Sequence, residues 1–321
     1  MKTAIIHVPH NPCEDSLKHM LESVGYRVFR LPKKALKTMM THCRQNVKKR
    51  LPEATWKQFM NADLLVVIKH FSVAKVRKSW PHLKDRVLWF DINGGQPSAN
   101  PPTYKHFKLA SPAPYVGSCK DMNDPAVSGP RYVCYIPLAD RPMFEVPRTE
   151  KQHPPICLVT NVHNWGYGGL AALVAKSGVV RMYGGHTKRG MIPYAKVPQY
   201  LSSATCYVHI KSRDCPGFSL YQAMAAKCPV VLSSNFVERT QYTDLYEDEK
   251  TCLFLHDSND KDMTKRMADM HAQIVVCTKR FEDRAFQRRI GEAAADRLRE
   301  VLWNKERDAE GFGAFMKDNF P

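Results

Sequence analysis

Short apolar runs alternate with amphipathic stretches along most of the chain, which is the pattern of β-strands and helices in parallel α/β layers. In the first part of the chain the strand-like runs are TAIIHV, YRVFRL, DLLVVI at 63–68, RVLWFDI at 86–92 and YVCYIPL at 132–138. The tract 93–130 is rich in Gly, Pro, Ser and Asn, so it predicts long loops.

The alternation restarts after a polar, proline-rich segment at 139–154. The second set of strand-like runs is PICLVTNV, VVRMYGG, CYVHIKS, PVVLSS and CLFLHD, and from about residue 259 to 319 the pattern is helical. The sequence therefore predicts an α/β protein of two Rossmann-like domains, 1–150 and 151–300, followed by a C-terminal helical segment, 301–321. Because ligands of open α/β sheets bind outside the carboxyl ends of the strands, the loops there are the place to look for chemistry.

The composition is that of a globular protein, with 44% hydrophobic and 25% charged residues. The chain has no apolar run of eighteen residues, and its opening, MKTAIIHVPHNP, is typical of a first strand rather than of a signal peptide. The ten cysteines form no CxxC pair, which favours free, buried thiols. We therefore expect a cytoplasmic protein.

Basic residues exceed acidic ones by 17, and the excess lies mainly in the first half. Residues 1–150 hold 24 Lys and Arg against 12 Asp and Glu, whereas residues 151–321 hold 24 against 19. Such an excess predicts either a polyanion-binding surface or a solvated helix face. The candidate nucleic-acid-binding residues form the densest basic run: Lys33, Lys34, Lys37, Arg44, Lys48, Lys49 and Arg50.

The most informative stretch is 197–234, which has the pattern of a helix, a strand, a loop, a helix and a strand. It resembles the donor-nucleotide region of GT-B glycosyltransferases, whose retaining members carry two glutamates separated by seven residues. Here Asp214 and Gln222 stand at those positions. The other residues that fit are Gly217, Phe218, Ala223, Met224, Ala225, Pro229 and Val230. A helix N-terminus after a strand suits an anionic phosphate, and Gln222 could bond ribose hydroxyls.

The resemblance implies a nucleotide-sugar donor, with UDP-sugar expected and no essential metal or other cofactor. In one inverting branch of the family, arginines clamp the diphosphate, but the loop TNVHNWGYGG after the first strand of the second half has none, and another arginine of that branch falls on Ser219. The charge would then be met by other cations or by backbone N–H groups. The remaining candidate donor-binding residues are Asn161, His163, Lys188, Arg189, Lys211 and Arg213.

Across most of its length the chain is similar to the phage DNA β-glucosyltransferases, inverting GT-B enzymes that act on hydroxymethylated cytosine in duplex DNA. The resemblance is carried by MKTAII, DLLVVIKH, RVLWFDINGGQPSA, VVRMYGG and VPQYLSSA. It implies double-stranded DNA with modified bases as a partner, a host-cytoplasmic location, and a final helix that packs back on the first domain. It also implies that Asp91, at the end of a strand, is the general base.

Alternatives remain for both the residues and the function. Asp91 precedes Asn-Gly and could instead stabilise a turn, in which case His10, after the first strand, is the second candidate base. The sequence has no GxxxxGK[ST] or GxGxxG motif, so kinase and dehydrogenase functions have no support. The alternative functions are transfer to a cell-envelope glycan or small molecule, and nucleic-acid binding by a catalytically decayed GT-B protein.

Overall fold

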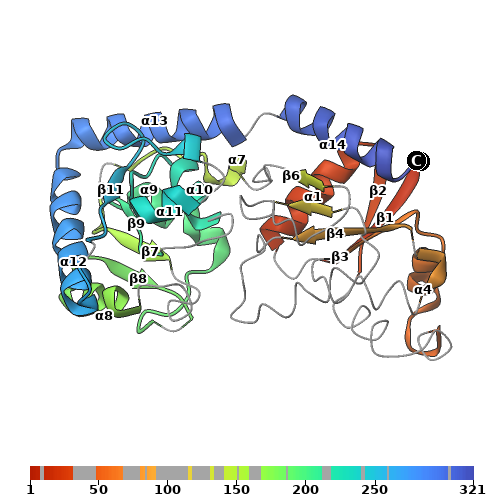
Figure 1. The fold of residues 1–321 in the computed structure, drawn as a ribbon, viewed down its shortest axis with the longest axis horizontal. Helices are drawn as coiled ribbons and strands as arrows, with labels where there is room; N and C mark the ends of the chain where they lie inside the picture. Colours follow the sequence, from red (N-terminus) through yellow and green to blue (C-terminus); the bar gives the residue numbers. More distant parts are fainter. Residues whose placement is uncertain are drawn as a thin grey trace. The chain divides into compact units, whose positions relative to one another are not determined.

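The computed structural model describes residues 1–7, 11–31, 48–67, 80–83, 85–91, 115–117, 131–133, 141–149, 152–158, 168–185, 187–211, 218–239, 243–258, 260–302 and 305–321. The chain divides into two compact units, 1–139 with 304–321, and 140–303. The second unit therefore begins before residue 151, and it includes most of the polar segment 139–154. Each unit contains one parallel sheet, as the alternation of apolar runs predicted (Figure 1).

The first unit is built on a six-stranded sheet in the order β2-β1-β3-β4-β5-β6. Its strands are β1 (Lys2–His7), β2 (Tyr26–Arg30), β3 (Leu64–Val67), β4 (Val87–Asp91), β5 (Tyr115–Gly117) and β6 (Arg131–Val133). The described part of this unit contains the helical segments α1 (Asn11–Ser23), α4 (Glu53–Met60), η1 (Pro81–Leu83) and α14 (Lys305–Asn319), and a helical turn at 48–50. The chain order reverses between β1 and β3, which is where such sheets form a ligand crevice.

The last helix, α14, is part of the first unit and lies against α1 (Figure 1). Phe312 and Met316 are buried on it, and a Cβ added at Gly313 would lie 3.5 Å from a methyl group of Val24. Beyond its end, Lys2 Nζ donates a hydrogen bond of 2.8 Å to the Phe320 carbonyl. The first strand and the end of the chain are thus held together.

The second unit is built on a five-stranded sheet in the order β11-β10-β9-β7-β8. Its strands are β7 (Ile156–Leu158), β8 (Arg181–Tyr183), β9 (Tyr207–His209), β10 (Val230–Ser233) and β11 (Leu253–Leu255). Its helical segments are α7 (Arg141–Phe144), α8 (Gly168–Ser177), η3 (Tyr194–Lys196), α9 (Val197–Ser203), α10 (Phe218–Ala225), α11 (Ser234–Arg239), η4 (Thr243–Leu245), α12 (Met263–Arg280) and α13 (Arg284–Leu302). Here the order reverses between β7 and β9.

Each of the ten predicted strands is present, but the prediction of loops throughout 93–130 was wrong at one place. Tyr115–Gly117 forms β5, which pairs in parallel with β4 on one side and with β6 on the other. Three residues are too few to show the alternation by which strands are recognised. The strand forms because the polar groups of its backbone complete the ladder between its neighbours.

Cysteines contribute to the buried interior of the second unit. Five cysteines of the second unit are buried and unpaired, as expected from their spacing: Cys157, Cys206, Cys228, Cys252 and Cys277. Burial raises the pKa of the Cys157 thiol to about 12, with a smaller opposing effect from Lys211. Among the described helices, none is both long enough and apolar enough to cross a membrane.

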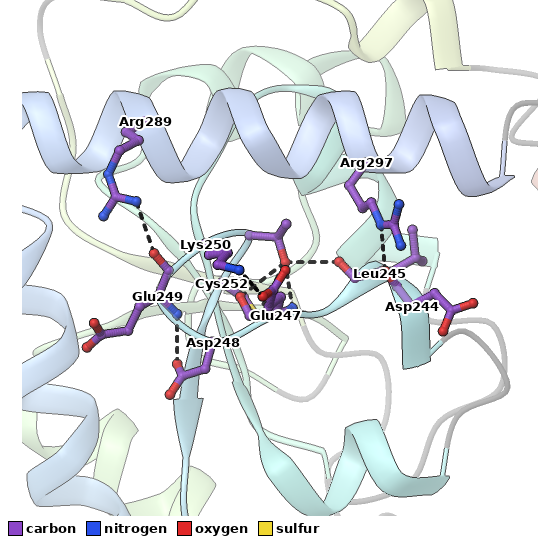
Figure 2. Close-up of polar contacts among 10 residues, drawn as sticks. Asp244, Leu245, Glu247, Asp248, Glu249, Lys250, Cys252, Arg289 and Arg297 are labelled. Carbon is purple, nitrogen blue, oxygen red and sulfur yellow. Dashed lines mark hydrogen bonds and ion pairs between the residues drawn. The ribbon is translucent and has the colours of Figure 1, made fainter.

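Helix α13 is tied to the turn 244–252 by two hydrogen bonds from its arginines. Arg297 Nε donates to the Asp244 carbonyl at 2.7 Å, and an Arg289 guanidinium nitrogen donates to the Glu249 carbonyl at 3.2 Å, as Figure 2 shows. These bonds satisfy carbonyls of a turn that lies outside the sheet ladder. They fix where α13 crosses the second unit.

Helix α13 also approaches the end of α10 so closely that only glycine fits at the contact. A Cβ added at Gly291 would lie 2.1 Å from the Lys227 carbonyl oxygen. Lys227 itself has a φ of 54°, in the left-handed region that costs side-chain-bearing residues energy. The turn between α10 and β10 is therefore held in a strained conformation under α13.

Lys227→Gly should stabilise the second unit by about 1 kcal/mol, because glycine adopts positive φ without a steric penalty. The measurement is the midpoint of urea unfolding, with Lys227→Ala as the matched control. Alanine removes the same side chain but keeps the strain, so its midpoint should stay near that of the unmodified protein. A glycine variant no more stable than the alanine variant would contradict this account of the turn.

Candidate functional site

The carboxyl edge of the second sheet brings together segments that follow β8 and β9. Helix α10 begins at Phe218, after β9, so its N-terminus lies at this edge. The first four N–H groups of a helix have no partner within it, and the helix dipole makes that end partly positive. The edge lies beside the point where the strand order reverses, between β7 and β9. It can therefore hold an anion.

Helix α10 is almost entirely enclosed, since six of its eight residues are buried. Gln222 is the polar member of that set, with 5% of its surface exposed. Its side-chain Nε2 donates to the hydroxyl of Tyr194, at a distance of 3.2 Å. The pattern that predicted Gln222 gave no indication of this partner, which comes from the segment after β8.

A second polar contact connects β9 with the first turn of α10. The Tyr207 hydroxyl lies 2.8 Å from Ser219 Oγ and 3.4 Å from His209 Nδ1. Tyr207 and His209 are two residues apart on one strand, so they share a face of the sheet. Ser219, a predicted donor-site residue, is thereby held in place by a strand residue that the sequence did not single out.

His209 is buried, and its ring packs edge-on against Phe236 with 4.7 Å between centroids. Desolvation lowers its pKa well below the usual value, and the charge of Lys211 lowers it further. The imidazole is therefore neutral near pH 7. Lys211, two residues after β9, is partly exposed, and it brings positive charge to the same edge.

The turn after β8 presents two further cations that the sequence suggested. Lys188 and Arg189 are both exposed. The turn is closed by a hydrogen bond of 2.8 Å from the Gly184 N–H to the Gly190 carbonyl, and Gly190 has a φ of 68°. The charges thus lie on a defined turn at the carboxyl edge.

Several of the predicted site residues lie outside the described residues: His10, Asn161, His163, Arg213, Asp214, Gly217, Lys33, Lys34, Lys37 and Arg44. Asp91 is the last residue of β4, and its backbone pairs in register with Gly117. Lys48, Lys49 and Arg50 follow one another on an exposed helical turn of the first unit. Among the described residues, no group of three or more His, Cys, Asp or Glu could hold a metal ion.

Sequence reasoning missed Tyr194, Tyr207 and His209. Tyr194 lies in MIPYAK, whose two features, a proline and a following lysine, are typical of a connection rather than of a site. Tyr207 and His209 lie in an apolar strand-like run, where aromatic side chains usually belong to the core. The one available signal was that Tyr207 and His209, which share one face of the strand YVH, both carry polar groups.

Comparison with known proteins supports a glycosyltransferase. Residues 158–307, which contain the edge described above, match a family model described as glycosyl transferase-like. None of the curated protein sequences matches the chain. This match covers the second half alone, so it concerns the donor side of the predicted enzyme.

The fold as a whole is similar to solved glycosyltransferase structures. HepE from Anabaena, in complex with UDP and glucose, has a TM-score of 0.67 at 11% identity, and the match covers 99% of this chain and 98% of that one. Sucrose-phosphate synthase from Thermosynechococcus elongatus has a TM-score of 0.60 at 15% identity, covering 100% and 99%. TarM from S. aureus has a TM-score of 0.55 at 11% identity, covering 81% of this chain and 55% of that one.

The predicted GT-B fold and the glycosyltransferase class are thereby confirmed. At 11–15% identity these structures support the fold and not a substrate. The finer resemblance to phage DNA β-glucosyltransferases stays a prediction.

The buried, neutral His209 should make the second unit less stable in mild acid. An unfolded histidine takes up a proton below about pH 6.5, whereas the folded one resists protonation, so the free energy of unfolding falls as the pH drops below that value. We expect His209→Gln to lose less stability than the unmodified protein between about pH 7.5 and about pH 5.5. Urea unfolding at the two pH values measures this difference.

His153→Gln is the matched control, because the His153 side chain is exposed in the same unit. This control should retain the acid dependence of the unmodified protein. An acid dependence that is the same in His209→Gln would show that the imidazole is not held neutral in the folded state.

Proposed function

We propose that this glycosyltransferase takes its sugar from a UDP-sugar, which the second unit binds at the carboxyl edge of its sheet. The observation that carries the proposal is the N-terminus of α10 at the strand-order reversal, with Gln222 one turn inside the helix. Lys188, Arg189 and Lys211 supply positive charge at the same edge. HepE was crystallised with UDP-glucose as well as with UDP, which supports uridine as the nucleoside.

The proposed chemistry is a single displacement at the anomeric carbon. Asp91 acts as the general base and takes the proton of the acceptor hydroxyl as that oxygen attacks. Positive charge develops on the sugar while the bond to the diphosphate breaks, and the leaving diphosphate is stabilised by the cations and by the N–H groups at the start of α10. One displacement inverts the configuration of the sugar. The position of Asp91 at the end of β4 supports this role.

For the acceptor we propose a hydroxyl on a modified base of double-stranded DNA, held by the basic first unit. Lys48, Lys49 and Arg50 support it, because three adjacent exposed cations suit a phosphate backbone. The second candidate is a cell-envelope glycan or a small molecule. TarM supports that candidate, since it was crystallised with α-GlcNAc-glycerol and UDP.

Calorimetry with UDP, ADP, GDP and CDP tests the donor. We expect UDP to bind more tightly than the other three, because the proposal assigns a uridine donor. Release of free glucose from UDP-glucose by the purified protein, without an acceptor, would distinguish an enzyme from a decayed nucleotide-binding protein. A protein that binds none of the four nucleotides would contradict the proposed donor site.

Asp91→Asn should reduce transfer on the order of a hundredfold to ten-thousandfold while leaving UDP affinity nearly unchanged. Asparagine keeps the size of the side chain but cannot take the proton, and a base that acts on the acceptor contributes little to donor binding. Transfer to a hydroxymethylated duplex and UDP calorimetry are measured on one preparation, together with its melting curve.

Asp85→Asn is the control, since Asp85 is an exposed carboxylate shortly before the same strand. It should retain full transfer. Activity of Asp91→Asn within a few-fold of the unmodified enzyme would show that Asp91 is a turn residue, and His10 would then be the base to test.

Replacing Lys48, Lys49 and Arg50 with Gln should flatten the dependence of DNA affinity on salt. Each phosphate contact that is lost removes about one unit from the slope of log affinity against log salt, so the change should reach up to about three units. Fluorescence anisotropy with a labelled duplex at several salt concentrations measures the slope.

The control replaces Lys261, Lys265 and Lys279 with Gln, because these three exposed lysines of the second unit carry the same total charge. That variant should keep most of the slope. Equal slopes for both variants would show that the cations of the first unit form a solvated face, and would favour the glycan or small-molecule acceptor.

A further inference from the structure

An apolar segment is exposed at the carboxyl edge of the second sheet, in the stretch 191–194 that follows β8. Met191 is 69% exposed and Tyr194 is 44% exposed. In the described part of the chain, the other large apolar side chains with comparable exposure are the N-terminal methionine and residues on the outer helices α8 and α12. Met191 and Tyr194 are thus the two that lie in the connection between β8 and α9, at the strand ends where ligands bind.

The Tyr194 ring is fixed in direction although it is exposed. On one side it makes an edge contact with the buried Phe144, with ring centroids 6.0 Å apart and an interplanar angle of 65°. At its tip, the hydroxyl oxygen accepts the hydrogen bond of 3.2 Å from Gln222 Nε2. Because α10 is buried on nearly all sides, Gln222 cannot move far, and the phenol is held with it.

The arrangement has the chemistry of a nucleoside site. A half-exposed aromatic ring, three residues after an exposed methionine, offers an apolar surface on which a base can stack. A hydroxyl that accepts from Gln222 can donate its own hydrogen to a further oxygen, as a ribose hydroxyl provides. The N-terminus of α10, which suits a diphosphate, lies one helical turn from Gln222. The stacking surface, the hydroxyl that can donate to ribose and the anion site therefore follow one another in the same order as the base, the ribose and the diphosphate of a nucleotide.

We propose that Met191 and Tyr194 bind the nucleoside of the donor, with Tyr194 as the residue that donates to the ribose while Gln222 orients it. This inference rests on the proposed donor. It assigns the hydrogen bond to ribose to Tyr194, whereas the sequence resemblance alone would assign it to Gln222. Gln222 is then a positioning residue, which acts through the phenol. A neutral amide suits this role, because it donates to the phenol oxygen and leaves the phenol hydrogen directed toward the ligand.

The competing explanation is that Tyr194 only packs η3 against α7. The two explanations differ in what the hydroxyl does. If Tyr194 only packs, Tyr194→Phe should leave nucleotide affinity unchanged, because phenylalanine keeps the ring and its contact with Phe144. If Tyr194 binds ribose, loss of the hydroxyl should weaken UDP binding although the fold is intact.

The experiment is calorimetry with UDP and with inorganic pyrophosphate on five full-length proteins: unmodified, Tyr194→Phe, Gln222→Ala, the double variant of both, and Tyr200→Phe as the control. Tyr200 is a tyrosine of the same unit whose ring meets Tyr183. We expect Tyr194→Phe and Gln222→Ala each to reduce the affinity for UDP by about fivefold to tenfold. The double variant should be no weaker than about the worse single one, because the two residues act through one hydrogen bond.

Pyrophosphate affinity should be equal in all five proteins, since pyrophosphate has no nucleoside. Unchanged UDP affinity in Tyr194→Phe, with an intact melting curve, would overturn the inference and leave the proposed donor standing. An equal loss of UDP and pyrophosphate would also overturn it, because the substitution would then have disturbed the phosphate site. Absence of UDP binding in the unmodified protein would overturn the proposed donor, and this inference with it.

Discussion

The rest of the second unit depends on how tightly α10 is enclosed. Six of its eight residues are buried, and at its end α13 comes so close that a Cβ at Gly291 would overlap the Lys227 carbonyl. Closely packed interiors tolerate little displacement, so the helix has one position. Its N-terminus is thereby held at the carboxyl edge of the sheet, and Gln222 is held toward the segment after β8. The proposed binding chemistry uses groups that the packing has already placed.

The neutral residue at position 222 fits this environment. A carboxylate with so little exposed surface would need a cation or several donors to offset its desolvation. The glutamine needs neither, since its amide donates to Tyr194. Positive charge at the edge is instead carried by exposed or partly exposed side chains, Lys188, Arg189 and Lys211. The edge therefore combines a neutral interior with a cationic rim.

Much of the fold could be predicted from the sequence, because strand and helix patterns are local. The apolar runs gave ten strands, and the string from Phe218 to Val230 gave α10 and β10. Strand β5 could not be predicted, since Tyr115–Gly117 becomes a strand only by pairing with β4 and β6. The contact between Tyr194 and Gln222 is hidden for the same reason. It joins a residue of η3 to a residue of α10, and a single sequence contains no signal that pairs them.

The most direct test of this account is amide hydrogen exchange of the full-length protein with and without UDP. UDP should slow exchange in the peptides that cover 187–196 and 218–225, since the nucleoside and the diphosphate contact those segments. Peptides from the first unit, such as 53–67, should exchange equally in both samples. Protection confined to the first unit, or no protection in either segment of the second at saturating UDP, would contradict the claim that this sheet edge is the donor site.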